Sequence, residues 1–401
     1  MPYEIDLFKA RKSMFKKSST FILILLLIAS FLNATLIDFY KKGLIKLEAD
    51  PHFGKNTSGD GSIYDTRCDF LRSPDGSFFI ADTTEHCLYR YSAEGKFISK
   101  HGQKGEGPGD LYFPGDLSVL DDRYVVIGEY ATSRRVSLFD LEGNFAKLLK
   151  TDRNAFTTVA LKDNKIAYKT YKYGPMKNQI QEFTTILIIK DVETGEEMVI
   201  DECQSQRKFI RVGGGGSFVM NTGAGEMLIT QTKYGNLVVG VTTSNELKIF
   251  SPEGQLLRSF ILKMDPVQVT RDYIRRYKES IIQGMEERGV RQSAIDATKK
   301  TPYEDAFGKY LPYFKEILVD SEGNILIFKK TDCIGDCNEV FQVYSPEGKY
   351  VCEMTIDSGI YDLTIDRRFK NIVFAGDAIY GLFPLKESEE SALQLIRVKL
   401  R

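Results

Sequence analysis

Two short loops carry the polar and charged side chains of this sequence that could bind a ligand. The residues are Asp82 and His86 in the first loop, and Glu129, Tyr130, Arg134 and Arg135 in the second. Adjacent arginines present planar guanidinium groups that can pair with a carboxylate or a sulfate. The sequence therefore offers an anion-binding surface at these loops, although a solvated connection between two strands is the simpler interpretation of the same residues. We recognise no set of catalytic residues in the sequence, so the catalytic residues are unknown.

The six cysteines and three histidines do not form a recognisable metal site. Cys333 and Cys337 enclose a segment with Gly335, which makes a small disulfide ring feasible, and two free thiols are the open alternative. No second Cys or His pair supports a metal at this place. Cys68 and Cys87 are expected on strands about 10 Å apart, beyond the ~7 Å Cα separation that a disulfide bridges. We therefore expect buried thiols there and predict no metal and no cofactor.

A recurring hairpin determines where these loops lie. Five turns follow an alternating strand and precede a second one, and they end at Gly95, Gly143, Gly195, Gly254 and Gly348. Glycine adopts the positive φ that closes such a turn, and proline or an acidic residue suits the positions before it. The first four glycines are separated by one repeat length and the last two by about twice that length. A period of about 40–50 residues with four strands is typical of a propeller blade.

The sequence therefore predicts an all-β fold, a six-bladed β-propeller of four-stranded blades that spans residues 35–401. Five blades carry the recurring turn, and the sixth is assembled from both ends of the chain. We expect strands at 361–365, 372–375 and 393–400, with an N-terminal strand near 44–48 pairing beside 393–400. This pairing would close the ring and remove its exposed edges.

Residues 266–311 interrupt the repeat between blades four and five and have a helical pattern. Thr270 can cap a helix that begins at Arg271, and apolar side chains recur on one face of it. Gly289 would end this helix, and a second, shorter helix is expected at 293–299. We interpret the insertion as a lid on one propeller face, with a partner-docking element as the alternative.

The first 34 residues have the pattern of a signal peptide or a membrane anchor. Five basic residues between positions 9 and 17 precede an apolar run at 21–32, and a small residue follows at Ala34. The run is shorter than the ~20 residues of a spanning helix, which favours a cleaved signal peptide over an uncleaved anchor. In either case the rest of the chain would be exported, with a periplasmic, cell-envelope or secreted location. It would touch a membrane only through this segment.

The overall composition argues against several other classes of protein. Lys and Arg total 54 against 55 for Asp and Glu, a formal net charge of −1, so a nucleic-acid partner is not expected. The chain has no Trp, which weakens an assignment to WD-repeat or quinoprotein propellers.

Two stretches resemble NHL-repeat six-bladed propellers and bacterial exported propellers of undefined function. One runs from His101-Gly102 through Gly105-Glu106-Gly107-Pro108-Gly109-Asp110 to Phe113-Pro114, and the other from Leu311-Pro312-Tyr313-Phe314 to Val319-Asp320-Ser321-Glu322-Gly323-Asn324. The resemblance covers roughly residues 60–401 and departs from tidier members in the turn of blade three and in the lack of Trp. It implies an architecture rather than an activity.

The resemblance leaves more than one function open. Some NHL-like propellers are lactonases or lyases whose inner strands hold a divalent metal on the axis. The polar residues near inner-strand ends here are Arg67, Asp69, Asp116 and Asp362, although Asp at a strand end often binds backbone N–H groups instead. The favoured hypothesis is a scaffold that binds a protein, peptide or glycan through loops on one face. The alternatives are a metal-dependent hydrolase or lyase, with calcium or zinc, and a structural part of an envelope assembly.

Overall fold

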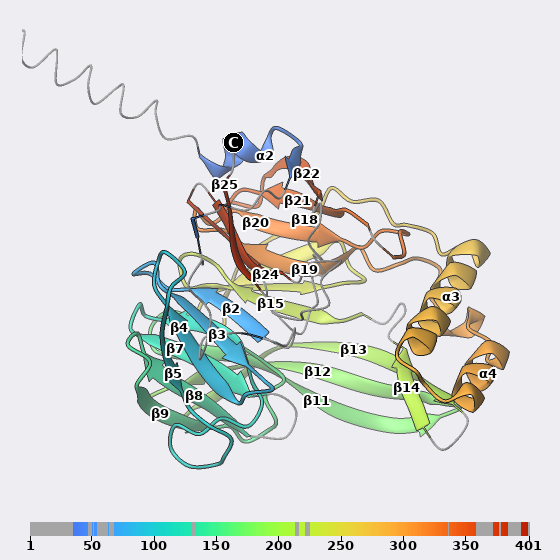
Figure 1. Cartoon of the computed structure of the whole chain (residues 1–401), viewed down its shortest axis with the longest axis horizontal. Helices are drawn as coiled ribbons and strands as arrows, with labels where there is room; N and C mark the ends of the chain where they lie inside the picture. Colours follow the sequence, from blue (N-terminus) through green and yellow to red (C-terminus); the bar gives the residue numbers. More distant parts are fainter. Residues whose placement is uncertain are drawn as a thin grey trace, which may run out of the picture.

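The computed structural model describes most of the chain that follows the N-terminal segment. The described residues are 35–46, 50, 52–53, 63, 68–129, 134–212, 216–220, 225–335, 337–357, 372–376, 378–383 and 394–399. They form six β-sheets and three α-helices (Figure 1). None of these helices is both long enough and apolar enough to cross a membrane. Each sheet is one blade of a ring.

The blades follow one another along the chain. Blade 1 contains β2 (Cys68–Arg72), β3 (Phe78–Asp82), β4 (Cys87–Tyr91) and β5 (Phe97–His101). Blade 2 contains β6 (Pro114–Leu120), β7 (Tyr124–Glu129), β8 (Arg135–Asp140) and β9 (Phe145–Lys150). Blade 3 contains β10 (Thr157–Ala160), β11 (Lys165–Lys177), β12 (Ile180–Asp191), β13 (Glu197–Val212) and β14 (Gly216–Met220).

The second half of the ring has the same order. Blade 4 contains β15 (Met227–Gln231), β16 (Leu237–Val241), β17 (Glu246–Phe250) and β18 (Leu256–Ile261). Blade 5 contains β19 (Phe314–Val319), β20 (Ile325–Lys329), β21 (Glu339–Tyr344) and β22 (Tyr350–Asp357), with β1 (Leu44–Lys46) added at its edge. Blade 6 contains, in its described part, β23 (Ile372–Ala375), β24 (Ala378–Phe383) and β25 (Gln394–Lys399).

The recurring glycine closes the hairpin between the last two strands of a blade, as the sequence predicts. Gly348 has a φ of 80°, and its N–H donates to the carbonyl of Ser345 at 2.8 Å. A Cβ at this position would lie 2.5 Å from Cδ1 of Phe260 in the neighbouring blade. Both the backbone conformation and the close approach therefore require glycine.

Six hydrophobic clusters hold the ring together, and each is shared by two neighbouring blades. Phe79 of blade 1 packs with Ile127 of blade 2 in one of them. In another, Tyr380 of blade 6 packs against Phe78 of blade 1, with ring centroids 5.0 Å apart. Because each sheet is covered on both sides by its neighbours, the apolar faces of all six are buried. The contact between the last and the first blade closes the propeller.

The predicted pairing of the N-terminal strand is wrong. Strand β1 pairs in parallel with β22 of blade 5, with Leu44 opposite Thr355, and not with β25. The cause is the short helix α2 (Leu36–Tyr40), which buries Tyr40 in the cluster between blades 5 and 6 and so delivers the next residues to β22. The chain reaches blade 6 only later, where the N–H of Asp50 donates to the carbonyl of Arg397 at 2.7 Å.

Blade 6 also differs from its predicted composition. The strand expected at 361–365 lies outside the described residues. Strand β23 lies beside β2, as an inner strand does, and pairs with β24, which the sequence analysis did not predict. The hairpin between them is closed by Ala375 and Ala378.

The insertion between blades 4 and 5 is helical, as predicted. Helix α3 (Arg271–Glu287) begins at the expected residue, where the side chain of Thr270 accepts from the N–H of Tyr273. Helix α4 (Gln292–Lys300) and the 3-10 turn η1 (Glu304–Ala306) follow. A small apolar cluster around Tyr303 holds the insertion together, and the isolated bridge between Gln268 and Tyr310 joins its two ends.

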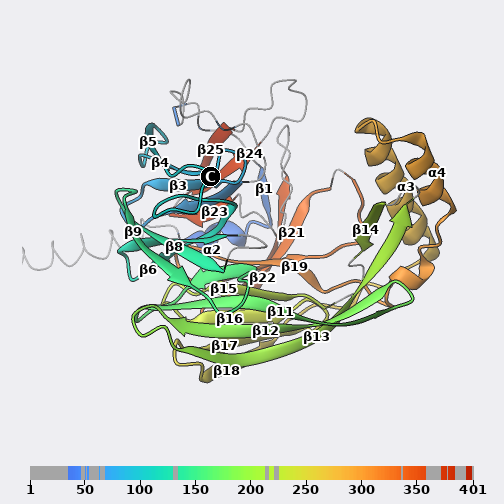
Figure 2. The ribbon, with the colours of Figure 1, turned by 90° about the horizontal axis from the view of Figure 1, so that it is seen from below.

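Blade 3 extends far beyond the ring. Strands β11, β12 and β13 have 13, 12 and 16 residues, whereas the strands of the other blades have at most eight. We call the extended part, residues 171–183 and 203–209, the arm. Figure 2 shows β11–β13 sweeping away from the ring toward the helical insertion, and α4 contacts β13. An irregular turn in this blade was predicted from the sequence, but the arm was not.

The strand order separates the connections into two sets. Because neighbouring strands of a blade are antiparallel, the links between second and third strands and the links between blades leave from the same strand ends. We call this side the loop face; it holds the arm tip, the helical insertion and the loop at 330–338. The tight turns leave from the opposite strand ends, the turn face. Helix α2 belongs to the turn face, since Tyr40 Oη donates to Asp320 Oδ2 at 2.9 Å.

Candidate functional site

Both predicted ligand-binding loops lie on the loop face and are joined by the link between blades 1 and 2. The ring of His86 contacts the carbonyl of Tyr112 through Nδ1. The N–H of Tyr112 in turn donates to Oε2 of Glu129 at 3.2 Å. The structure therefore brings these two loops together, whereas Tyr130 lies outside the described residues.

The two adjacent arginines have different surroundings. Arg135 forms an ion pair with Glu129, with Nε and Oε1 2.8 Å apart, and the side chains are 11% and 0% exposed. Arg135 also donates to the carbonyl of Asp110. Arg134 is exposed, and its carbonyl accepts from the N–H of Thr151 at 2.9 Å. Arg135 is thus engaged inside the protein, and of the two only Arg134 faces solvent.

Asp82 also has a role within its own loop. Its Oδ1 accepts from the N–H of Thr84 at 2.8 Å and from that of Glu85 at 3.0 Å. The hydroxyl of Thr83 donates to the carbonyl of Pro114 at the start of β6. The bond from Thr83 fastens blade 1 to blade 2, and the contact of Arg135 with Asp110 fastens the link between these blades to blade 2.

The carboxylates near the axis join inner strands to one another. Asp69 Oδ2 accepts from the N–H of Leu117 in the next blade at 2.7 Å, and Asp116 Oδ2 accepts from the N–H of Thr158 in the blade after that at 3.1 Å. Arg67 and Asp362 lie outside the described residues. Within the described ranges no three His, Cys, Asp or Glu side chains are grouped as metal ligands. The described residues therefore do not fit an axial calcium or zinc centre.

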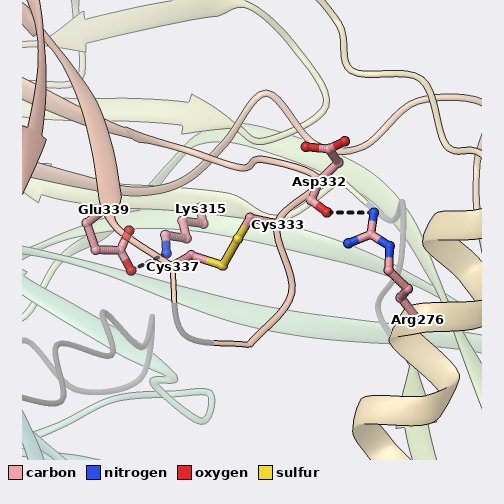
Figure 3. Close-up of a disulfide and its surroundings, with 6 residues drawn as sticks. All are labelled: Arg276, Lys315, Asp332, Cys333, Cys337 and Glu339. Atoms are coloured by element: carbon pink, nitrogen blue, oxygen red, sulfur yellow. Dashed lines mark hydrogen bonds and ion pairs between the residues drawn. A yellow bond between two sulfur atoms is a disulfide. The ribbon is translucent and has the colours of Figure 1, made fainter. Parts of the chain in front are cut away.

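The loop at 330–338 contains the Cys333–Cys337 disulfide, with a Cα separation of 6.3 Å (Figure 3). Arg276 of α3 donates from Nη2 to the carbonyl of Asp332 at 3.4 Å, which ties the loop to the helical insertion. At its base, Lys315 Nζ lies 2.6 Å from Glu339 Oε1. Burial, together with the charge of Lys315, lowers the pKa of Lys330 nearby.

The four remaining cysteines should differ in reactivity. Cys68 and Cys87 are buried, and burial raises the pKa of Cys87 to about 12, while Cys203 and Cys352 are half-buried. A thiolate is the reactive form of cysteine. We expect a thiol reagent at pH 8 to leave Cys68 and Cys87 unmodified in the folded protein. In denaturant it should modify four thiols, and modification of all six without a reductant would contradict the disulfide.

A cluster of aromatic and polar side chains, which was not predicted from the sequence, lies on one face of the arm. We call it the arm cluster; its members are Tyr171, Tyr173, Phe183, Ser205 and Arg207. The guanidinium of Arg207 lies 4.4 Å from the centroid of the Phe183 ring and 5.0 Å from that of Tyr171. The ring of Tyr173 lies beside both and is 53% exposed. The sequence signal was the alternation of Tyr171 and Tyr173. It indicates an exposed cluster only once the length of the strand, and hence its extension beyond the ring, is known.

The family comparison agrees with a propeller. Residues 67–213 match the model of the DUF5128 family, described as a 6-bladed beta-propeller. No curated protein matches the chain. Among solved structures, a protein described as exported from Bacteroides fragilis is 13% identical, with a TM-score of 0.49 and coverage of 88% of this chain and 98% of its own.

Two further solved structures show the same range of similarity. A member of the DUF4221 family from Bacteroides vulgatus is 10% identical, with a TM-score of 0.43 and coverage of 88% and 95% of the two chains. An inactive variant of virginiamycin B lyase from Staphylococcus aureus is 11% identical, with a TM-score of 0.37 and coverage of 86% and 82%. The NHL-repeat resemblance stays a prediction from the sequence. From the family match and the closed ring of sheets, we conclude that the chain has a six-bladed β-propeller fold.

Proposed function

We propose that this protein is an exported scaffold that binds a protein, peptide or glycan through its loop face. The observation that carries the proposal is the unequal elaboration of the two faces. The arm, the helical insertion and the disulfide loop all leave from the loop-face strand ends. The turn face, in the described part of the chain, consists of the short hairpins that the ring itself requires and the five-residue helix α2.

The arm exposes side chains that the ring does not need. Tyr173 and Met176 are 53% and 54% exposed, although each is large and apolar. Exposed aromatic and methionine side chains are typical of binding surfaces in proteins. Export is supported by the basic and apolar segments of the first 34 residues.

A photo-crosslinking amino acid at single tyrosines tests this proposal. Tyr173 on the arm and Tyr310 on the insertion report on the loop face, and Tyr234, in the hairpin between β15 and β16, is a matched position on the turn face. Tyr234 is 62% exposed, so accessibility alone would give this control position the highest crosslinking yield. In intact cells we expect discrete adducts from Tyr173 or Tyr310 at a yield at least tenfold above that from Tyr234. Adducts from Tyr234 alone, or the same adducts from all three positions, would contradict the proposal.

A further inference from the structure

We propose that the arm binds an extended acidic peptide segment, which adds as a strand to the open edge of β11 and pairs a carboxylate with Arg207. The inference rests on the proposed function and names the chemistry of the partner. It depends on three properties of the arm: a cation without an acidic partner among the described residues, a strand edge with which no described strand pairs, and a local excess of positive charge.

The first property is the state of Arg207. Its guanidinium stacks on Phe183 and Tyr171, and among the described residues it makes no hydrogen bond or ion pair. Its Nε and the hydroxyl of Ser205 are buried atoms without a hydrogen-bond partner in the described part of the chain. A half-buried guanidinium that rests on aromatic rings keeps its nitrogen edge available for a bidentate bond to a carboxylate.

The second property is the edge of β11. The carbonyl of Lys169 accepts from the N–H of Phe156, and β10 pairs with β11 no further than Lys169. Backbone groups two residues apart on a strand point the same way, so those of Tyr171 and Tyr173 point to this edge. No described strand pairs with them there. An extended peptide can complete such an edge with main-chain hydrogen bonds.

The third property is charge. The arm carries four cationic side chains, and its one acidic residue is Glu182; the cations are Lys172, Lys177, Arg207 and Lys208. The chain as a whole has a formal net charge of −1, so the arm differs in sign from the chain as a whole. Positive charge favours an acidic partner and speeds its association. Pro175 also ends the open edge after Gly174, which limits pairing to a short segment and disfavours extended aggregation.

These properties favour a peptide over an acidic glycan. A uronic acid could supply the carboxylate and stack on Tyr173, but it would leave the open backbone edge of β11 unused. A peptide strand uses the edge and the charge together. Because side chains of a strand alternate, an acidic residue at every second position would face Arg207 and the arm cluster.

Fluorescence anisotropy with the purified full chain tests the inference. The probe is a fluorescein-labelled ten-residue peptide of alternating Glu and Val. We expect saturable binding that weakens with salt and that Arg207→Gln weakens at least tenfold. The matched control is Arg134→Gln, which removes an exposed arginine of the loop face outside the arm and should leave the affinity within twofold.

Two further measurements separate a peptide strand from an acidic glycan. A peptide with N-methyl groups at every second residue cannot complete the strand edge, and we expect it to bind at least tenfold more weakly in at least one of the two methylation registers. The assignment to a peptide strand would be overturned if both methylated peptides bound as tightly as the unmethylated peptide. It would also be overturned if polygalacturonate bound as tightly as that peptide and its binding also depended on Arg207. Unchanged binding by Arg207→Gln with an unaltered circular dichroism spectrum would overturn the site.

The result can be separated from the fate of the proposed function. If crosslinking at Tyr310 gives adducts while Arg207→Gln changes nothing, the loop face binds its partner elsewhere and the arm site is wrong. If Arg207→Gln unfolds the arm, Arg207→Lys, which keeps the positive charge, is tested in its place. We expect Arg207→Lys to retain more affinity for the peptide than Lys172→Met, which removes a neighbouring charge. The reverse order would contradict the inference.

Discussion

Replacing Arg135 with methionine is expected to lower the free energy of unfolding by about 3–5 kcal/mol. Its partner Glu129 has a fully buried side chain, and the ion pair with Arg135 is 2.8 Å long. The substitution leaves the carboxylate buried without this cation and also removes the donor to the carbonyl of Asp110. Urea unfolding, followed by circular dichroism, measures the change.

Two variants serve as controls for this prediction. Removing both charges in Glu129→Leu/Arg135→Met should cost less than removing Arg135 alone, because no buried charge is left behind. Lys329→Met breaks the more exposed pair with Glu353, whose side chain is 40% exposed, and should cost less than about 1 kcal/mol. If Arg135→Met also costs less than 1 kcal/mol, the pair does not hold the link between blades 1 and 2 in place, and a role in ligand binding regains support.

Replacing Tyr40 with alanine should destabilise the protein by about 3–5 kcal/mol, as expected for a large buried aromatic side chain. Tyr40 is 0% exposed, packs edge-on against Phe341 at 6.0 Å between ring centroids, and donates to Asp320 Oδ2. It belongs to the N-terminal segment, yet it fills the cluster between blades 5 and 6. Thermal unfolding measures the change, and a shift too small to resolve would show that this segment is not part of the ring.

Tyr40→Phe separates the hydroxyl from the ring. Burial raises the pKa of Asp320, and the hydrogen bond from Tyr40 opposes this rise. A carboxyl whose pKa is higher in the folded state adds stability at low pH, and that stability is lost as pH rises through the folded-state pKa. Loss of the hydroxyl raises the pKa of Asp320 further, so Tyr40→Phe should cost more at pH 7 than at pH 4. An equal cost at both values would contradict this role of the hydrogen bond.

The ring was predictable because its signal is local. A glycine such as Gly254 or Gly348 is required by the turn itself, and the spacing of such turns counts the blades without reference to any distant contact. Helix α3 was predictable for the same reason, since Thr270 caps it and apolar residues recur along it. The pairing of strand β1 was not predictable, because its three residues pair with the sheet edge that the packing of α2 places next to them. That packing depends on Phe341 and Phe374, about 300 residues away in the chain.

The candidate site was only partly predictable. Glu129 and Arg135 have the residue types of a ligand-binding loop, and a sequence cannot show that they bind each other. Asp69 and Asp116 have the positions of metal ligands, and the structure shows them accepting from backbone N–H groups of neighbouring blades. The arm escaped prediction because strand pairing, and not a change in residue type along β12 and β13, sets the boundary between the ring and the extended part of the blade. Arg207 becomes a candidate only once that boundary is known.

The attachment of α2 to the turn face decides how the ring would stand on a bilayer if the apolar run at 21–32 stayed in the lipid. Residues 33 and 34 alone separate that run from Thr35, a reach of about 10 Å. The hairpins nearest the lipid would then carry many acidic side chains, among them Asp75, Glu94, Glu142, Glu253, Glu322 and Glu347. Anionic headgroups repel such a surface. A membrane-anchored propeller would therefore be held close to the bilayer without lying on it, and the arm would point away from the membrane.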